Sequence, residues 1–215
     1  MRYEEFLTVF QRTPIIDSGM LAAFGESRGY RALQLSRWVR EGKLIQLRRG
    51  FYIIAPPFQK ENPSPYLVAN TLHHPSYVSL QSALAEYGLI PEAVPVITSV
   101  TAGRPGEWET PVGTFRYRHI RNELFFGYRN MGTSKRPVFV ATPEKAVLDL
   151  MYFIRHRVSP EWMDEMRFQH LEVLSRKRLL DFAGRFESAA VSRAARLFLN
   201  HRKKRTGEFT EEAFS

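Results

Sequence analysis

Residues 30–54 read YRALQLSRWVREGKLIQLRRGFYII, and they decide the fold of the N-terminal part of the chain. The stretch predicts a helix, a stop at Gly42 and a short hairpin with two arginines and a glycine at its bend. Apolar spacing predicts two further helices before it, over residues 3–12 and 16–24. Three helices followed by a hairpin, the wing, are typical of a winged helix-turn-helix.

The third predicted helix has one apolar and one polar face. Ala32, Leu35, Trp38 and Val39 form the stripe that we expect to be buried. The side chains expected to contact DNA are Tyr30, Arg31, Gln34, Arg37 and Arg40 on the helix, with Arg31 at the edge of the stripe, and Arg48 and Arg49 on the wing. Arginine and glutamine read guanine and adenine edges bidentately in the major groove. Arginines at a hairpin tip reach phosphates or the minor groove.

The charge of the chain favours the same partner. The 215 residues include 31 Lys and Arg against 22 Asp and Glu, which gives a formal net charge of +9. Seven bases and one acid lie between positions 28 and 49. Such an excess favours nucleic acid first and an acidic membrane second. The alternatives are an incidentally basic protein, or a protein-interaction head whose arginines are only solvated.

Composition and motifs exclude several other classes. The absence of cysteine excludes disulfides, thiolate metal sites and a cysteine nucleophile. No apolar run approaches the ~20 residues needed to span a bilayer, and the N-terminus lacks the apolar core of a signal peptide. A cytoplasmic protein is therefore expected.

The sequence offers no catalytic motif. GxSxG, HExxH, P-loop and GxGxxG patterns are missing, and the six histidines show no metal-ligand spacing. Glu144 is interpreted as helix first-turn charge. Lys145 and Asp149 are expected to form an i,i+4 pair worth roughly 0.2–0.5 kcal/mol. We therefore expect no enzyme, no cofactor and no metal.

The chain divides at a proline-rich linker. Residues 55–65 contain four of the thirteen prolines, and they separate a head, residues 1–58, from a body, residues 66–215. The expected fold class is α+β. The body should begin with helices over residues 66–72 and 77–87. A small, partly antiparallel sheet is expected over residues 94–140, with a turn at residues 104–106. Thr142 and Pro143 should then start the first helix of a helical C-terminal part. The basic cluster at residues 201–205 is interpreted as charge that complements a helix dipole rather than as a second phosphate contact.

Five segments carry a family resemblance. In chain order they are LIQLRRGFYII (44–54), YVSLQSALAEYGLI (77–90), GTFRYRHI (113–120), LFFGYRN (124–130) and ATPEKAVLDLMY (141–152). Together the pattern resembles the AbiEi family, antitoxins of type IV toxin–antitoxin systems that also act as transcriptional repressors. The resemblance extends over roughly residues 15–155.

The resemblance implies a double-stranded DNA partner and a toxin. A winged head would bind inverted repeats in the protein's own promoter, through Gln34, Arg37, Arg40, Arg48 and Arg49. The body would support cooperative binding and antitoxin activity against a nucleotidyltransferase toxin, with direct contact left open. Two alternatives remain: a winged-helix regulator unrelated to a toxin, and a protein- or RNA-interaction module whose body carries the activity.

Overall fold

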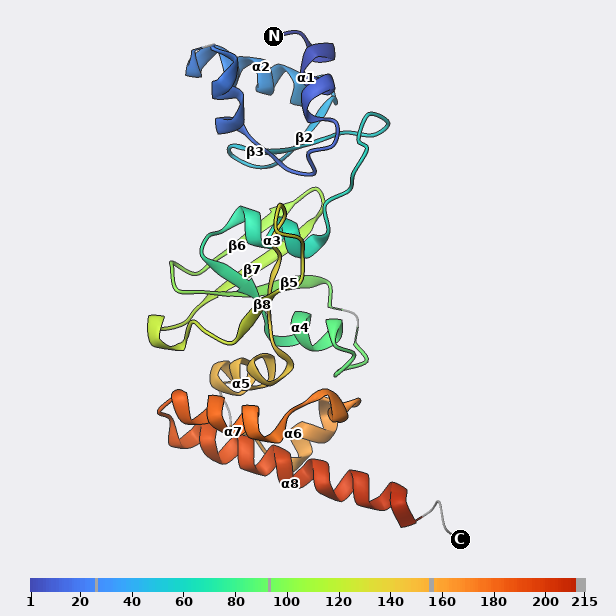
Figure 1. Ribbon diagram of the computed structural model, residues 1–215, viewed down its shortest axis with the longest axis vertical. Helices are drawn as coiled ribbons and strands as arrows, with labels where there is room; N and C mark the ends of the chain where they lie inside the picture. Colours follow the sequence, from blue (N-terminus) through green and yellow to red (C-terminus); the bar gives the residue numbers. More distant parts are fainter. Residues whose placement is uncertain (26, 93, 155–156, 212–215) are drawn as a thin grey trace.

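The computed structural model describes residues 1–25, 27–92, 94–154 and 157–211, with side chains as far as His201. Figure 1 shows three parts stacked along the long axis: an N-terminal head, a sheet with its helices, and a set of C-terminal helices. Helices and strands are mixed throughout, as the expected α+β class requires. No helix in the described part of the chain is both long and apolar enough to cross a membrane.

The head contains three helical segments and a small sheet. Its elements are α1 (Tyr3–Phe10), β1 (Ile16–Asp17), the 3-10 helix η1 (Ser18–Phe24), α2 (Arg28–Arg40), β2 (Leu44–Arg48) and β3 (Phe51–Ile54). The strands run in the order β1-β3-β2, and both pairings are antiparallel. The Ser27 hydroxyl accepts a hydrogen bond from the backbone N–H of Tyr30 and so caps α2, as the sequence predicts for a serine at this position.

The prediction of one helix over residues 16–24 is wrong in its first two residues and in its type. Ile16 and Asp17 pair with β3 as a short strand. The Asp17 side chain then accepts a hydrogen bond from the backbone N–H of Gly19, which starts a 3-10 helix. Gly25 ends this helix in the left-handed conformation, at φ 73°, as expected.

Trp38 is the centre of the head core. Its ring centroid lies 4.8 Å from that of Phe6 and 5.3 Å from that of Tyr3. The buried cluster around it consists of Tyr3, Phe6, Phe10, Ile16, Leu21, Leu35, Trp38, Leu44, Tyr52 and Ile54. Aromatic rings thus connect α1 and α2 over one face of the small sheet.

The body begins with a six-stranded mixed sheet and its helices. The elements are α3 (Pro65–Leu72), β4 (Ser76–Val78), α4 (Leu80–Glu86), β5 (Val96–Thr101), β6 (Gly106–Thr110), β7 (Gly113–His119), η2 (Asn122–Leu124), β8 (Tyr128–Asn130) and β9 (Phe139–Ala141). The strand order is β6-β7-β5-β4-β9-β8. The β5–β7 and β4–β9 pairs are parallel and the others are antiparallel, so the predicted partly antiparallel sheet is confirmed.

Two local predictions in the body are wrong. Residues 77–87 were expected to form one helix, but Tyr77 and Val78 belong to β4 and the helix starts only at Leu80. Residues 104–106 were all expected to lie in a turn, but Gly106 is the first residue of β6 and pairs with Tyr117 of β7. Both errors arise because pairing with a distant strand decides the backbone conformation of a short segment.

Helices form the C-terminal end. They are α5 (Pro143–Phe153), α6 (Pro160–Glu165), η3 (Leu171–Val173), α7 (Arg176–Arg185) and α8 (Ala189–Glu211). Thr142 caps α5 and Pro143 occupies its first turn, as the sequence predicts. In Figure 1, α5 lies between the sheet and the α7–α8 pair, which forms the end of the molecule opposite the head.

The β2–β3 hairpin is a layer shared by head and body. Tyr52 and Ile54 of β3 pack into the head core, whereas Ile53 and Leu47 join the buried cluster of the body. Both faces of β3 are therefore covered. Figure 1 shows the hairpin on the side of the head that faces the sheet. The predicted wing thus contributes to the junction between the two parts.

Candidate nucleic-acid interface

The outer face of α2 is exposed. Leu33 is 71% exposed and Tyr30 51% exposed, and Arg37 and Arg40 are exposed beside them. Arg31 is partly buried, because it precedes the buried Leu35 by four residues and therefore shares its side of the helix. Three predicted contact residues, Tyr30, Arg37 and Arg40, therefore lie on one accessible surface of α2.

Gln34 is a correction. It was predicted to lie on the outer face, but only 7% of it is exposed, and its Nε2 donates a hydrogen bond to the Met1 carbonyl oxygen at 2.9 Å. The reason is helical geometry. Gln34 precedes the buried Trp38 by four residues and therefore shares its side of the helix. The buried face is rotated towards Gln34, and Ala32, predicted to be buried, is exposed.

Arg48 is a second correction. It was predicted to reach DNA from the hairpin bend. Instead its Nη1 donates a hydrogen bond to the Leu72 carbonyl oxygen at 2.8 Å, and its guanidinium lies 4.4 Å from the centre of the Trp108 ring. A cation beside the last carbonyl of α3 is favourable to that helix terminus. Arg48 thus fastens the hairpin to the body.

The Arg48 contacts continue into a stack of rings. The His73 ring contacts those of Trp108 and Tyr117 at centroid distances of 5.1 and 4.8 Å, and the latter two rings contact each other at 4.6 Å. Burial, and then the positive charge of Arg48, lower the pKa of His73 below its usual value. The neutral imidazole is therefore the form that fits this junction.

Arg49, the other predicted wing residue, is exposed at the bend. The next residue, Gly50, has φ 92°, and its carbonyl oxygen accepts a hydrogen bond from the Ser18 backbone N–H at 2.8 Å. This bond ties the hairpin bend to the start of η1. Arg49 therefore lies at the edge of the head, beside the segment that precedes α2.

A second set of contacts joins head and body along the linker. Arg136, in the loop before β9, forms an ion pair with Glu61 and donates a hydrogen bond to the Arg12 carbonyl oxygen at 2.7 Å. Polar contacts thus surround the apolar contacts of Leu47 and Ile53. The orientation of the head is set by this junction.

The charge at the end of α2 is partly compensated. Arg37 Nε lies 3.6 Å from Glu41, and Lys43 Nζ lies 2.8 Å from the other oxygen of the same carboxylate. The hydrogen bond from Lys43 is the main cause that lowers the pKa of Glu41. These groups are exposed, and such pairs contribute only about 0–1 kcal/mol to stability. A phosphate could therefore replace Glu41 as the partner of Arg37 at little cost.

The excess of basic over acidic residues lies in the N-terminal and C-terminal segments of the sequence. Residues 1–55 contain nine bases and five acids, residues 56–175 twelve of each, and residues 176–215 ten bases and five acids. Nearly half of the excess therefore belongs to the head. The rest belongs to residues 176–215, of which α7 and α8 lie at the end of the molecule opposite the head, while the side chains of the basic residues 202–205 lie outside the described part.

A buried ionic cluster lies in the body, and the sequence did not reveal it. Lys145 and Asp149 form an ion pair in which both side chains are 0% exposed. Tyr77 and Ser79 donate hydrogen bonds to Asp149 Oδ2 at 3.0 and 2.7 Å. Burial lowers the pKa of Lys145 and raises that of Asp149. The expected weak surface pair is therefore a buried network that connects α5 with β4.

Glu144 lies in the first turn of α5, as predicted, and it is also completely buried. Its Oε1 accepts a hydrogen bond from the backbone N–H of Ser175 at 2.8 Å, and Arg178 approaches its Oε2 at 3.5 Å. Ser175 is the N-cap residue of α7. Glu144 thus holds the start of α7 against α5, so it has a structural role.

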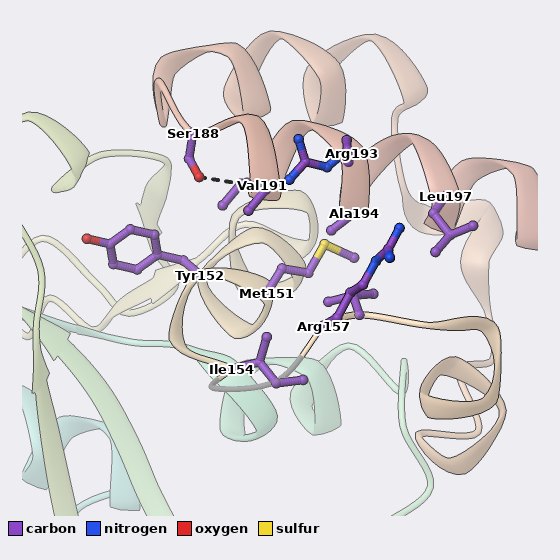
Figure 2. A pocket seen from close by; sticks show the side chains of 11 residues that line it. Met151, Tyr152, Ile154, Arg157, Ser188, Val191, Arg193, Ala194 and Leu197 are labelled. Carbon is purple, nitrogen blue, oxygen red and sulfur yellow. Dashed lines mark hydrogen bonds between the residues drawn. The ribbon is translucent and has the colours of Figure 1, made fainter.

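A cavity of about 670 Å³ lies between α5 and α8. Figure 2 shows Tyr152 and Leu197 at opposite ends of its lining and Met151 between them. Arg157 and Arg193 supply its charged groups. Its volume is in the range of small-molecule sites, and its arginines would favour an anion. Among the described side chains, no group of three or more His, Asp or Glu could hold a metal ion.

The head is similar to a known protein family. Residues 5–55 match the family model described as transcriptional regulator, AbiEi antitoxin. Over these residues the head is similar to the AbiEi regulators, and the resemblance predicted from the sequence is confirmed for the head.

The overall fold also has a counterpart. The crystal structure of the RV2827C protein from Mycobacterium tuberculosis is similar over 91% of this chain and 75% of that chain, with a TM-score of 0.59 and 14% sequence identity. At this identity the similarity establishes a shared fold alone. No curated protein matches the chain.

Proposed function

We propose that the chain is a DNA-binding autorepressor and the antitoxin of a toxin–antitoxin pair. The observation that carries the proposal is the exposed outer face of α2, with Tyr30, Arg37 and Arg40, in a segment that matches the AbiEi family. The order α1-β1-η1-α2-β2-β3 supports a winged helix-turn-helix at residues 1–58, followed by a body at residues 66–215. Such a protein would act in the cytoplasm, on inverted repeats in its own promoter.

The DNA-contacting residues in this proposal are Tyr30, Arg31, Arg37 and Arg40 of α2 and Arg49 of the bend. Gln34 and Arg48 are left out because their side chains are engaged elsewhere. The remaining arginines can neutralise phosphates on either side of the groove that α2 would enter.

A gel-shift series on the DNA upstream of the protein's own gene tests the repressor function. We expect tighter binding than to scrambled DNA of the same length. Replacing Arg37 or Arg40 by Ala should weaken binding, and the slope of log K against log salt should flatten by about one unit per lost phosphate contact. Arg116→Ala is the control, because Arg116 is an exposed body arginine paired with Glu107. Equal affinity for operator and scrambled DNA would refute the proposal.

The antitoxin function rests on the family match. The proposed target is a nucleotidyltransferase toxin encoded beside this gene, neutralised with or without direct contact. Co-expression with the neighbouring gene's product should restore growth when the intact chain is present. Growth arrest that persists at equal expression would exclude the antitoxin function and leave a regulator unrelated to a toxin.

One observation favours a second candidate, a protein-interaction module. Met20 and Phe24 of η1 are 48% and 40% exposed, close in sequence to the exposed Tyr30 and Leu33 of α2. Exposed apolar patches often mark protein interfaces. Size-exclusion chromatography with light scattering separates the two candidates, since a protein interface between copies predicts a dimer that Leu33→Asp dissolves.

A further inference from the structure

The outer face of α2 has an apolar centre. Gly29, Leu33, Ser36 and Arg40 follow one another at i, i+4, i+7 and i+11, so they lie along one line of the helix surface. Leu33 occupies the middle of this line. Its exposed fraction of 71% exceeds that of every other large apolar side chain in the described structure.

Polar groups that read base edges are scarce at this centre. The amide of Gln34 is turned inwards and bonded to Met1. Ala32, exposed next to Leu33, adds a methyl group, and Ser36 adds a hydroxyl. The charged side chains Arg28, Arg37 and Arg40 are all exposed and come from the ends of the helix or its flank. The outer face of α2 therefore has an apolar patch with positively charged arginine side chains beside it.

We infer that Leu33, together with Ala32, recognises the C5-methyl group of thymine in the major groove. This inference rests on the DNA binding proposed above and adds the base that the helix selects. In the major groove, guanine and adenine present polar acceptors or donors, cytosine presents an amino group, and thymine alone presents a methyl group. A leucine pressed against a polar edge would leave that edge without a hydrogen-bond partner, which is unfavourable. Only thymine offers it an apolar surface.

The arginines around Leu33 favour DNA, rather than a second copy of the chain, as the partner of the outer face of α2. If two identical α2 faces met, Arg28, Arg37 and Arg40 of one copy would be brought close to those of the other, and like charges oppose such an interface. On DNA the same arginines would lie near phosphates while Leu33 faces the base edges. The distribution of charge around Leu33 thus complements a duplex.

The test measures binding of the full chain to the DNA upstream of its own gene, made once with thymidine and once with deoxyuridine in its place. The two duplexes differ only by the methyl groups. Wild-type affinity should fall about fourfold for each methyl group that loses its contact, from the transfer free energy of one buried methylene. For Leu33→Ala the ratio between the two duplexes should approach one. The exposed side chain makes this variant safe for folding, and alanine favours the helix. Val112→Ala, at an exposed apolar position of the body, is the matched control and should keep the wild-type ratio.

Each outcome is decisive. Loss of the methyl effect in Leu33→Ala alone supports thymine recognition. An equal methyl effect in Leu33→Ala and wild type, or none in either while operator DNA is still preferred over scrambled DNA, overturns the inference and leaves the repressor proposal intact. Failure of the wild type to prefer operator DNA overturns the repressor proposal itself. A change of oligomeric state in Leu33→Ala would assign this face to protein association and also overturn the inference.

Discussion

Replacing Lys145 by Met should reveal how strongly the buried ion pair couples α5 to the sheet. Lys145 and Asp149 are completely buried, so the substitution removes one charge and leaves a carboxylate without its ionic partner. Removing one member of a buried pair destabilises a protein by about 3–5 kcal/mol. Tyr77 and Ser79 still donate hydrogen bonds to Asp149 in the variant, which places the expected loss near the lower limit, at about 3 kcal/mol.

The pH dependence of this loss gives the prediction a second signature. Burial already raises the pKa of Asp149, and without Lys145 the largest of the causes that oppose this rise disappears, while the hydrogen bonds from Ser79 and Tyr77 remain. A carboxyl whose pKa is higher in the folded than in the unfolded state is favoured in its protonated form. Its stabilising contribution is complete below the unfolded pKa of about 3.9 and disappears as the pH rises through the folded pKa. The deficit of the variant should therefore be smaller at pH 5 than at pH 8.

Urea unfolding followed by tryptophan fluorescence measures both effects. Arg37→Met is the matched control, because Arg37 and Glu41 have the same i,i+4 spacing but are exposed, which predicts a loss of about 0.3–0.5 kcal/mol. Adding Asp149→Asn to Lys145→Met should recover much of the loss, since an amide oxygen can still accept from Tyr77 and Ser79. If Lys145→Met lost no more than Arg37→Met at pH 8, the pair would behave as a surface pair and the explanation would be refuted.

Three further predictions concern the head and its junction. Arg48→Ala should increase the rate of proteolysis within residues 56–64 and leave the salt dependence of DNA binding unchanged. Arg49→Ala should make the affinity for DNA less dependent on salt. If Arg48→Ala and not Arg49→Ala reduced the salt dependence, Arg48 would belong to the DNA-contacting residues. Because the pKa of His73 is lowered, the free energy of unfolding should fall as the pH drops below about 6.5, the usual histidine value. His73→Gln should flatten this dependence, whereas a flattening by the control His119→Gln as well would contradict the assignment. Gln34→Ala should lower stability by about 1 kcal/mol without relaxing base preference, and selection from random DNA would reveal any change in preference.

The ends of α2 and the start of α5 could be predicted from the sequence because local signals mark them. Ser27 before α2, Gly42 after it and Thr142-Pro143 at the start of α5 act on their own backbone, and each has the predicted role. The apolar repeat of α2 was predicted with less accuracy. Leu35 and Trp38 are buried as expected, but the choice of Ala32 over Gln34 as their neighbour depended on hydrophobicity alone.

The position of Gln34 shows why hydrophobicity was insufficient. The rings of α1 cover Trp38, and whatever side chain lies one turn before Trp38 is covered with it. Gln34 tolerates this position because the Met1 carbonyl oxygen satisfies part of its amide. That partner lies 33 residues away in sequence, so no local pattern could predict it. Arg37 and Arg40 are exposed as predicted, whereas Gln34 is buried, and the role of the two arginines in DNA contact stays a prediction.

The different roles of Arg48 and Arg49 have a comparable origin. In a regular strand, side chains alternate between faces, so the neighbours Leu47 and Arg48 should point in opposite directions. The register of β2 against β3 shifts between Gln46 and Arg48, and this irregularity lets both Leu47 and Arg48 contact the body. A shift of this kind is invisible in the sequence RRG, in which the two arginines are equivalent. The body therefore takes one arginine of the hairpin for its junction with the head, whereas Arg49 is exposed at the bend, which the hydrogen bond between Ser18 and Gly50 ties to the start of η1. DNA binding in the proposed mode consequently relies on α2 much more than on its wing.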